Sequence, residues 1–390
     1  MRYENVCVEA FAYTLPAEIL TTTEIEARLE PLYRRLRLPE GRLEMLTGIR
    51  ERRLFPEGML PGEQSVRTVE RLLQTAKCDR NRIGTLIHGS VCSDYAEPAT
   101  ACSVHHRLGL PPECEIYDVS NACLGIVNGM LQIANRIELG QIRAGIVVGT
   151  ETSRSLLEST IRRLNTDQSL DRRSIKPAFA SLTIGSGSGA VLLTHRSISR
   201  TGNRLLGGVV GASTTHCELC MSATDPLGRD SAGTSMQTDS EELMIQGVNA
   251  ASGTFERFLA ETGWNRDQIN RVFSHQVGRK HHQLLFESLR LPGDINFSTL
   301  EYLGNTGSCA LPTAAAIGME NGFAGPGDRI ALLGIGSGIN VLMLALEWNH
   351  TLAAAPSPED RETIDRIMRL NTARRETAAP SLTFPAARLE

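Results

Sequence analysis

The amino-acid sequence predicts an α/β protein made of two similar halves, each a sheet covered by helices on both faces. The first observation is a repeated spacing between a strand that ends in histidine and a later cysteine. His88 precedes Cys123 by 35 residues. His275 precedes Cys309 by 34. The second observation is that a continuous apolar run, typical of a buried parallel strand, follows each cysteine. This repeated order indicates an internal duplication.

Composition supports a large globular core and excludes several classes of partner. The chain has 390 residues, of which 41% are hydrophobic and 22% charged. Its net charge of -4 gives no reason to expect a nucleic-acid partner. No stretch is apolar enough for a membrane span, and the N-terminus lacks the apolar core of a secretion signal. The nine irregularly spaced cysteines fit a reducing compartment, so we expect a cytoplasmic protein.

The predicted first half comprises residues 1–195. Apolar patterns predict strands at Val6 to Thr14, Ile83 to Val91, Glu115 to Val119, Ala144 to Thr150 and Ile184 to Leu193. Helices are expected from a capping box at Thr23 to Glu26, at Glu63 to Ala76, at Thr100 to Leu108, and from Cys123 to Gly140. Leu46 to Leu54 is interpreted as a loop with an exposed basic edge, and residues 151–181 as an irregular insertion.

The predicted second half comprises residues 196–348. Strands are expected at Asn270 to His275, Ile330 to Leu333 and Asn340 to Glu347, and a helix carries the pair His281 and His282. Residues 349–390 are rich in Ala, Pro, Thr and Arg, and we expect them to be an extension outside the core. Within it, Pro358 to Leu370 could form one amphipathic helix, and Ala378 to Glu390 is predicted to be disordered.

Cys123 lies where a strand gives way to a long helix. Free backbone N–H groups and the positive end of the helix dipole favour a thiolate at such a position, and the thiolate is the nucleophilic form. A single free cysteine on an apolar segment is, however, more often inert core filling. This stretch alone leaves both interpretations open.

The second half contains two polar groups in apolar surroundings that could assist a nucleophile. His275 follows Val272 and Phe273, and Asn305 lies between glycines. A cysteine with a histidine and an asparagine is suited to hold a thioester carbonyl as it becomes an oxyanion or enolate. The alternatives are a satisfied core histidine, as we also expect for His88, and a turn asparagine chosen for its backbone conformation.

Two basic clusters have two interpretations each. They comprise Arg34, Arg35 and Arg37, and the run Arg50 to Arg53. Each is either a solvated face or a dock for an anionic carrier or a nucleotide phosphate.

Two other motifs are expected to have no special chemistry. His216, Cys217 and Cys220 could form half of a metal site, but no second half occurs at usable spacing, so we expect no metal. The glycine-rich run at residues 185–189 lacks a following Lys-Ser/Thr, so we do not expect it to bind phosphate.

Four motifs in unbroken order carry a family resemblance. They are Asn121 to Gly125 (NACLG), His275 to Gly278 (HQVG), Leu303 to Gly307 (LGNTG) and Gly334 to Gly338 (GIGSG). Over residues 1 to about 348 the chain resembles the thiolase-superfamily condensing enzymes of the ketosynthase III type. The resemblance implies a five-layered αβαβα sandwich, a homodimer, and a catalytic triad of Cys123, His275 and Asn305.

The resemblance also implies how the substrate is held. The backbone amide of Cys123 and one amide from the turn Gly336, Ser337 and Gly338 would form the oxyanion hole. Acyl-CoA or acyl-carrier-protein thioesters would be substrates, and no cofactor is expected. Cys309, which duplicates the position of Cys123, is expected to be packed and inert.

Within this family, the sequence is most similar to the OleA-like acyl-CoA condensing enzymes of long-chain olefin biosynthesis. The motifs that carry this similarity are Asp94 to Pro98, Ser120 to Gly125 and Gly334 to Ile339. Those enzymes join two fatty acyl-CoA molecules without decarboxylation, so a base must remove an α-proton. The resemblance assigns this role to Glu97, 26 residues before Cys123, acting across the dimer interface. The alternative is that Glu97 only caps a turn before Pro98.

The sequence thus predicts an acyltransferase that forms an acyl-Cys123 thioester and then performs a non-decarboxylative Claisen condensation. The nearest alternative is a decarboxylative β-ketoacyl synthase III that uses malonyl-carrier protein. A hydrolase or acyl-transfer enzyme on the same scaffold is a further alternative. An alternative of another class is a non-catalytic, carrier-docking subunit.

Overall fold

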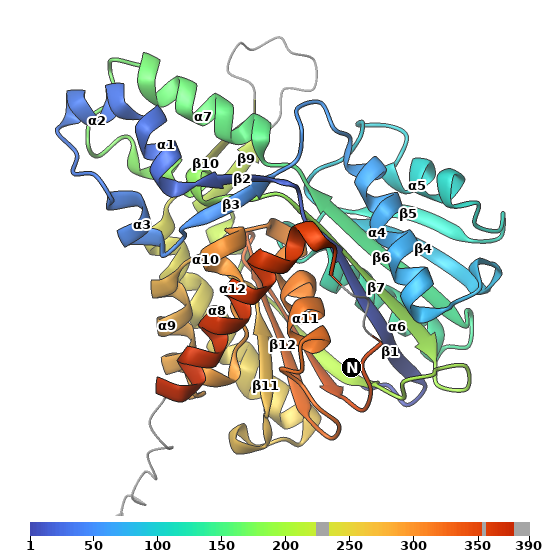
Figure 1. Ribbon diagram of the computed structural model, residues 1–390. Helices are drawn as coiled ribbons and strands as arrows, with labels where there is room; N and C mark the ends of the chain where they lie inside the picture. Colours follow the sequence, from blue (N-terminus) through green and yellow to red (C-terminus); the bar gives the residue numbers. More distant parts are fainter. Residues whose placement is uncertain (224–233, 353–355, 378–390) are drawn as a thin grey trace, which may run out of the picture.

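The computed structural model describes residues 1–223, 234–352 and 356–377. Within them, nine strands form one mixed sheet in the order β11-β12-β13-β8-β1-β7-β6-β4-β5 (Figure 1). The strands of the first half are β1 (Val6–Thr14), β4 (Ile83–Gly89), β5 (Glu115–Val119), β6 (Ala144–Glu151) and β7 (Gly187–His195). Those of the second half are β8 (Arg204–Ala212), β11 (Arg271–Ser274), β12 (Arg329–Gly336) and β13 (Asn340–Glu347).

The two groups of strands meet where β1 pairs with β8 through the single register pair Cys7 and Arg204. The division expected at residues 195–196 falls between β7 and β8. In the first half β4 pairs in parallel with both β5 and β6, and in the second half β11 pairs in parallel with β12. His88 is the second-last residue of β4, Ser120 follows directly after β5, and His275 follows directly after β11. All three therefore lie at the carboxyl ends of parallel strands.

Helices form three layers around the strands. The outer helices of the first half are α4 (Pro61–Ala76) and α5 (Thr100–Leu108), which share a buried cluster with β4, β6 and β7. The central helices are α6 (Gly125–Glu138) and α11 (Ala310–Glu320). The outer helices of the second half, α8 (Ser240–Thr262) and α9 (Arg279–Leu289), pack on β12 and β13.

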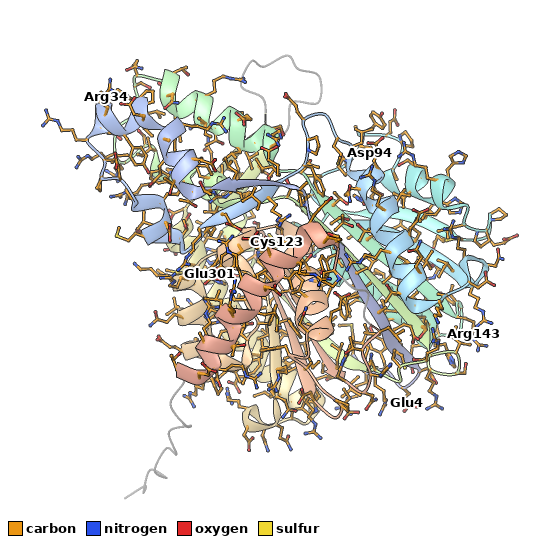
Figure 2. All side chains as sticks on the ribbon, viewed as in Figure 1. Glu4, Arg34, Asp94, Cys123, Arg143 and Glu301 are labelled. Carbon is orange, nitrogen blue, oxygen red and sulfur yellow. The ribbon has the colours of Figure 1, made fainter. Side chains whose placement is uncertain are left out.

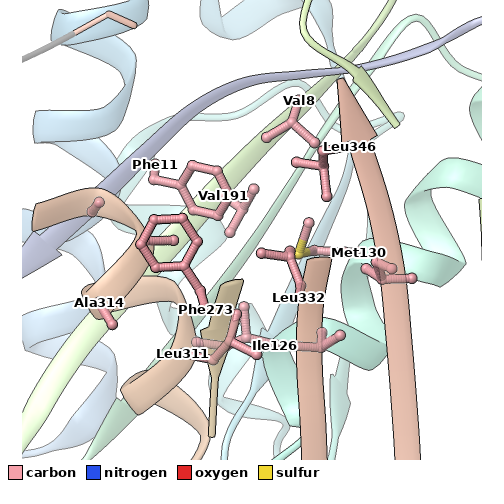
Figure 3. Close-up of a cluster of buried hydrophobic side chains, with 14 of the residues drawn as sticks. Val8, Phe11, Ile126, Met130, Val191, Phe273, Leu311, Ala314, Leu332 and Leu346 are labelled. Atoms are coloured by element: carbon pink, nitrogen blue, oxygen red, sulfur yellow. The ribbon is translucent and has the colours of Figure 1, made fainter. Parts of the chain in front are cut away.

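The central cluster draws side chains from both halves (Figure 3). Ile126 and Met130 of α6, Leu332 and Leu346 of the second half and Ala314 of α11 belong to this one buried cluster. Every residue of α11 except its last is buried, as expected of a helix between the two halves of the sheet. The layers alternate as αβαβα, so the predicted fold class is confirmed.

The interpretation of Leu46 to Leu54 as an exposed basic loop was wrong. Its end is the strand β3 (Glu51–Leu54), which pairs with β2 (Glu18–Thr21), and both Arg52 and Arg53 are fully buried. The capping box of α1 (Thr22–Arg28) is also shifted, because Thr21 rather than Thr23 is the N-cap and pairs with Glu24.

The expectation of an irregular insertion at residues 151–181 was wrong as well. This segment contains α7 (Arg154–Thr166), in which Leu157, Ile161 and Leu164 are buried. These three side chains follow helical spacing between arginines and pack against α1 and α2 (Glu30–Leu36).

The helix predicted at Pro358 to Leu370 extends further and does not lie outside the core. It is α12 (Pro358–Thr377), and its Ile364 and Ile367 are buried in the central cluster. The disorder expected for Ala378 to Glu390 lies outside the described residues. No helix in the described ranges is long and apolar enough to cross a membrane.

The remaining elements are short. They are α3 (Arg42–Thr47), β9 (Cys220–Ala223), β10 (Ser235–Thr238), α10 (Leu300–Leu303) and 3₁₀ helices at Arg80–Arg82, Lys176–Thr183, Thr214–Leu219, Arg266–Gln268, Gly293–Ile295 and Gly307–Cys309.

Candidate active site

Cys123 lies in a tight turn between β5 and α6, near the centre of the molecule (Figure 2). The helix begins at Gly125, two residues later than the sequence predicted. Ala122 has a positive φ of 45°, which non-glycine residues rarely adopt and which often marks functional turns. Asn121 fixes the turn, because its side-chain amide donates to Asn128 Oδ1 at 3.0 Å.

The surroundings of Cys123 favour the thiol, not the thiolate. Loss of solvent around the sulfur raises the pKa of Cys123 to about 12, and the Glu151 carboxylate and the Cys220 thiol act in the same direction. The backbone N–H of Cys123 itself lowers the pKa, but its effect is smaller. The thiolate that the sequence predicted at this position is therefore not favoured, and the thiol could act as a nucleophile only with a base to accept its proton.

His275 follows directly after β11 and is anchored to β12, because its backbone N–H donates to Leu333 O at 2.9 Å. Its imidazole is buried, and neither ring nitrogen has a hydrogen-bond partner among the described residues. Burial, with a smaller contribution from His281, lowers the pKa of His275 to about 3. His275 is thus a neutral imidazole with a free donor and a free acceptor, and the alternative of a satisfied core histidine does not fit.

Asn305 is held between the two halves. Its backbone N–H donates to Thr183 O at 3.0 Å, and the Gly185 N–H donates to Asn305 O at 2.9 Å. The side-chain Oδ1 accepts the Gly307 N–H at 3.0 Å, so the turn role considered from the sequence is present. Because this bond occupies the oxygen, the amide NH2 group is left to donate to a ligand.

The close approach around Asn305 explains Gly185, the first glycine of the run at residues 185–189. A Cβ on Gly185 would lie 2.1 Å from the Leu303 carbonyl oxygen, so no side chain fits there. This glycine is required by packing between the halves and needs no bound phosphate to account for it.

The turn after β12 lies against Cys123. A Cβ on Gly336 would lie 3.6 Å from the backbone nitrogen of Cys123. The Asn340 side chain donates to Asn121 Oδ1 at 2.9 Å and to Ser337 O at 3.2 Å, which ties the two turns together. Cys123 and the segment Gly336 to Gly338 therefore lie side by side. His275 is hydrogen-bonded to Leu333 of β12, three residues before Gly336.

Glu151 is a buried residue of this region that sequence reasoning missed. It ends β6, where Oε1 accepts from the Val91 N–H at 3.1 Å and from the Ser308 hydroxyl at 2.6 Å, and Oε2 accepts from the Cys92 N–H at 3.2 Å. It connects the loop 90–99 with the turn that follows Asn305. The available signal was an acidic residue directly after the apolar run Ala144 to Thr150.

The structure does not bring Glu97 together with Cys123 within one chain. Glu97 is exposed at the tip of the loop 90–99. The base of this loop is fixed by Asp94, whose carboxylate accepts from the Gly62 N–H at 2.7 Å and from the Ser103 hydroxyl at 3.0 Å. Figure 2 shows Asp94 on the α4 and α5 side, apart from Cys123.

Cys309 and His88, the duplicates of Cys123 and His275, are both buried. The Cys309 thiol donates to Gly149 O at 3.1 Å, and burial raises its pKa well above the usual value, as expected of a packed cysteine. His88 was expected to be satisfied, but its Nε2 has no partner among the described residues. Burial keeps it neutral by lowering its pKa.

In the described part of the chain, no group of three His, Cys, Asp or Glu side chains could hold a metal ion, and Cys217 is exposed.

Two family models match the chain. "Thiolase, N-terminal domain" matches residues 62–197, and "3-Oxoacyl-[acyl-carrier-protein (ACP)] synthase III C terminal" matches residues 259–348.

Two curated relatives match over their full length. The acyl-CoA:acyl-CoA alkyltransferase of Shewanella oneidensis is 38% identical over 351 residues, and that of Xanthomonas campestris pv. campestris is 32% identical over 348 residues; each match covers 89% of this chain. A β-ketoacyl-[acyl-carrier-protein] synthase III of Streptomyces coelicolor is 26% identical over 341 residues, 86% of this chain and 94% of that protein.

Solved structures of Xanthomonas campestris OleA have the same fold. A variant with a glutamate replaced by alanine matches with a TM-score of 0.83 and 32% identity, over 89% of this chain and 99% of that chain. A variant with a cysteine replaced by serine, bound to lauric acid and lauroyl-CoA, matches with a TM-score of 0.83 and 31% identity, over 89% and 100%. The chain therefore belongs to the OleA family of acyl-CoA:acyl-CoA alkyltransferases, thiolase-fold condensing enzymes related to ketosynthase III.

Proposed function

We propose that this enzyme condenses two fatty acyl-CoA molecules head to head without decarboxylation. Cys123 takes the first acyl group as a thioester, and the enolate of the second acyl-CoA attacks it, giving a β-ketoacyl product or, after hydrolysis, a β-keto acid. The observation that carries the proposal is the full-length match at 38% identity to an acyl-CoA:acyl-CoA alkyltransferase. A related OleA also binds lauroyl-CoA.

In the acylation step, the Cys123 sulfur attacks the thioester carbonyl and CoA leaves as the thiol. Because the pKa of Cys123 is raised, its proton must be taken up as the sulfur attacks, and the neutral imidazole of His275 is suited to accept it. The negative charge that develops on the carbonyl oxygen would be held by the Cys123 N–H and by one N–H from Gly336 to Gly338.

In the condensation step, Glu97 would remove the α-proton of the second acyl-CoA. The enolate oxygen would accept hydrogen bonds from His275 and from the free NH2 group of Asn305. The enolate carbon then bonds to the acyl carbonyl carbon, and the Cys123 sulfur leaves and regains a proton. No metal or other cofactor takes part in these steps.

We place Glu97 in the active site of a partner subunit in a homodimer. In one chain Glu97 is exposed on a loop whose Tyr95 and Val91 side chains are also exposed, at 58% and 48%. Exposed apolar groups on an anchored loop favour a protein contact. The substituted glutamate and cysteine of Xanthomonas campestris OleA are separated by the same number of residues as Glu97 and Cys123.

The nine free cysteines fit a cytoplasmic location.

The test is to supply the purified protein with one long-chain acyl-CoA and no malonyl donor. We expect release of CoA and a product whose mass corresponds to two joined acyl chains. Turnover that requires a malonyl thioester would instead support a decarboxylative β-ketoacyl synthase III, which the C-terminal family match makes the second candidate.

Glu97→Gln separates the two reactions. The condensation we propose needs a base and should lose at least about 100-fold in kcat, whereas a decarboxylative enzyme obtains its carbanion by losing CO2 and should be little affected. Glu113→Gln, an exposed acidic residue before β5, is the control and should behave as the unmodified protein.

A further inference from the structure

The helix α12 supplies the ionic partners of buried charges that lie near the candidate active site. The matches to the two alkyltransferase relatives cover the whole of each relative but 89% of this chain. The C-terminal family match ends at residue 348. The helix Pro358–Thr377 lies beyond that point. Among the described residues, three buried charged side chains form their ion pairs with residues of α12. The pairs are Glu51 with Arg366, Arg53 with Asp360, and Glu301 with Arg374.

We propose that α12 is a positioning element of the active site and that Asn371 is its main positioning residue. Asn371 is buried and makes a reciprocal pair of bonds with the backbone of Ser298. Its Oδ1 accepts the Ser298 N–H at 2.8 Å, and its Nδ2 donates to Ser298 O at 2.8 Å. Two bonds to one backbone unit fix both the position and the orientation of that unit, as a neighbouring strand would.

Ser298 leads in turn to His275 through Gln276. Gln276 Oε1 accepts the N–H groups of Thr299 and Leu300 at 2.8 and 3.0 Å, and the Ser298 hydroxyl oxygen lies 3.3 Å from it. Gln276 Nε2 donates to Phe297 O at 2.8 Å. The residue next to His275 is thus bonded at three points to the segment that Asn371 holds.

The same segment continues into Asn305. Ser298 precedes α10 (Leu300–Leu303), and Asn305 follows that helix after a single glycine. Arg374 of α12 forms an ion pair with the buried carboxylate of Glu301, in the middle of this stretch, and the Ser298 hydroxyl donates to the same carboxylate at 3.0 Å. α12 therefore restrains both groups that are proposed to hold the enolate oxygen. The inference rests on the proposed function for its catalytic consequence.

The experiment compares Asn371→Ala with Arg369→Ala, an exposed residue of the same helix without an ion pair in the described part of the chain. CoA release from long-chain acyl-CoA is measured per active Cys123, which is counted by alkylation, together with Tm. We expect Asn371→Ala to lower kcat roughly 10- to 100-fold with little change in KM, because a small misplacement of catalytic groups is sufficient for such a loss. Arg369→Ala should match the unmodified enzyme.

Amide hydrogen exchange of residues 296–305 gives a readout that does not depend on turnover. Exchange should be faster in Asn371→Ala and unchanged in Arg369→Ala. An unmodified protein without activity on acyl-CoA would contradict the proposed function, while the exchange result would still decide whether Asn371 orders this segment.

Asn371→Ser covers the case in which the alanine variant does not fold. A serine hydroxyl can bond to Ile367 O, which Asn371 also contacts four residues back in the helix, but it is too short to reach Ser298. A folded variant of either kind with normal kcat per active Cys123 and normal exchange overturns the proposal. Failure of both variants to fold also overturns it, since Asn371 would then serve stability alone.

Discussion

Glu151 places a carboxylate beside the candidate nucleophile, and within the described ranges it forms no ion pair with a basic side chain. Its oxygens are satisfied by two backbone N–H groups of the loop 90–99 and by Ser308, so the charge is held by hydrogen bonds from both sides of the site. At the scale of single residues, the resting thiol of Cys123 follows from this charge together with burial. Reactivity is thereby held back until a base accepts the proton.

We predict that Glu151→Gln lowers the pKa of Cys123, because it removes a negative charge that opposes the thiolate. Alkylation of Cys123 by iodoacetamide at pH 8 should accelerate by up to about tenfold for each unit by which the pKa falls, because the thiolate fraction rises tenfold. Mass spectrometry after digestion would follow Cys123 separately from the other cysteines. Glu241→Gln, at an exposed position of α8, should leave the rate unchanged. An unchanged rate in Glu151→Gln would show that burial alone sets the pKa.

At the scale of elements, β11 and α9 bring three neutral histidines together. Burial lowers the pKa of His275 to about 3 and of His281 and His282 to about 4. In the unfolded chain these side chains take up protons below about pH 6.5. The folded state remains unprotonated down to pH 3 to 4, so the unfolded state binds more protons in between, and stability must fall as the pH drops from about 6.5 toward 4.

His281→Gln tests this pH dependence without altering a proposed catalytic group. His281 is buried, and its replacement should reduce the slope of unfolding free energy against pH by up to about 1.4 kcal/mol per pH unit between pH 4.5 and 6. Urea unfolding at several pH values gives the slope. The matched control is His106→Gln, on an exposed position of α5, for which we expect the slope of the unmodified protein. Equal slopes in all three proteins would contradict the neutral state of His281.

At the scale of the whole molecule, the two similar α/β halves were predictable from apolar periodicity and from the repeated spacing around Cys123 and Cys309, while the family resemblance implied their five layers. α5 and β13 have the predicted bounds because their patterns are local. Arg53 was assigned to an exposed edge because arginine is usually exposed. Its buried position depends on Asp360, more than 300 residues away, and no local pattern records that partner.

In the candidate site, too, the features with a local sequence pattern were predictable and those that depend on distant residues were not. Cys123, His275 and Asn305 could be predicted because motifs mark them, whereas the raised pKa of Cys123 could not, since it arises from burial and from Glu151 on another strand. The contacts of Asn371 were equally hidden, because an asparagine in a polar helix carries no sequence signal of its own. Sequence reasoning therefore proposed candidate reacting groups but not the residues that surround and hold them.

The proposed homodimer makes a prediction about mixed subunits. If Glu97 acts on Cys123 of the partner subunit, Glu97→Ala and Cys123→Ala proteins are each inactive, but a dimer containing one of each has one complete site. Random mixing after mild dissociation gives half mixed dimers with one site of two restored, so condensation activity should return to about one quarter of the unmodified level. Mixing Glu97→Ala with the double variant Glu97→Ala/Cys123→Ala is the control and should restore nothing. If Glu97 acted within its own chain, no mixture would recover activity, because every Cys123 would lie in a subunit without Glu97.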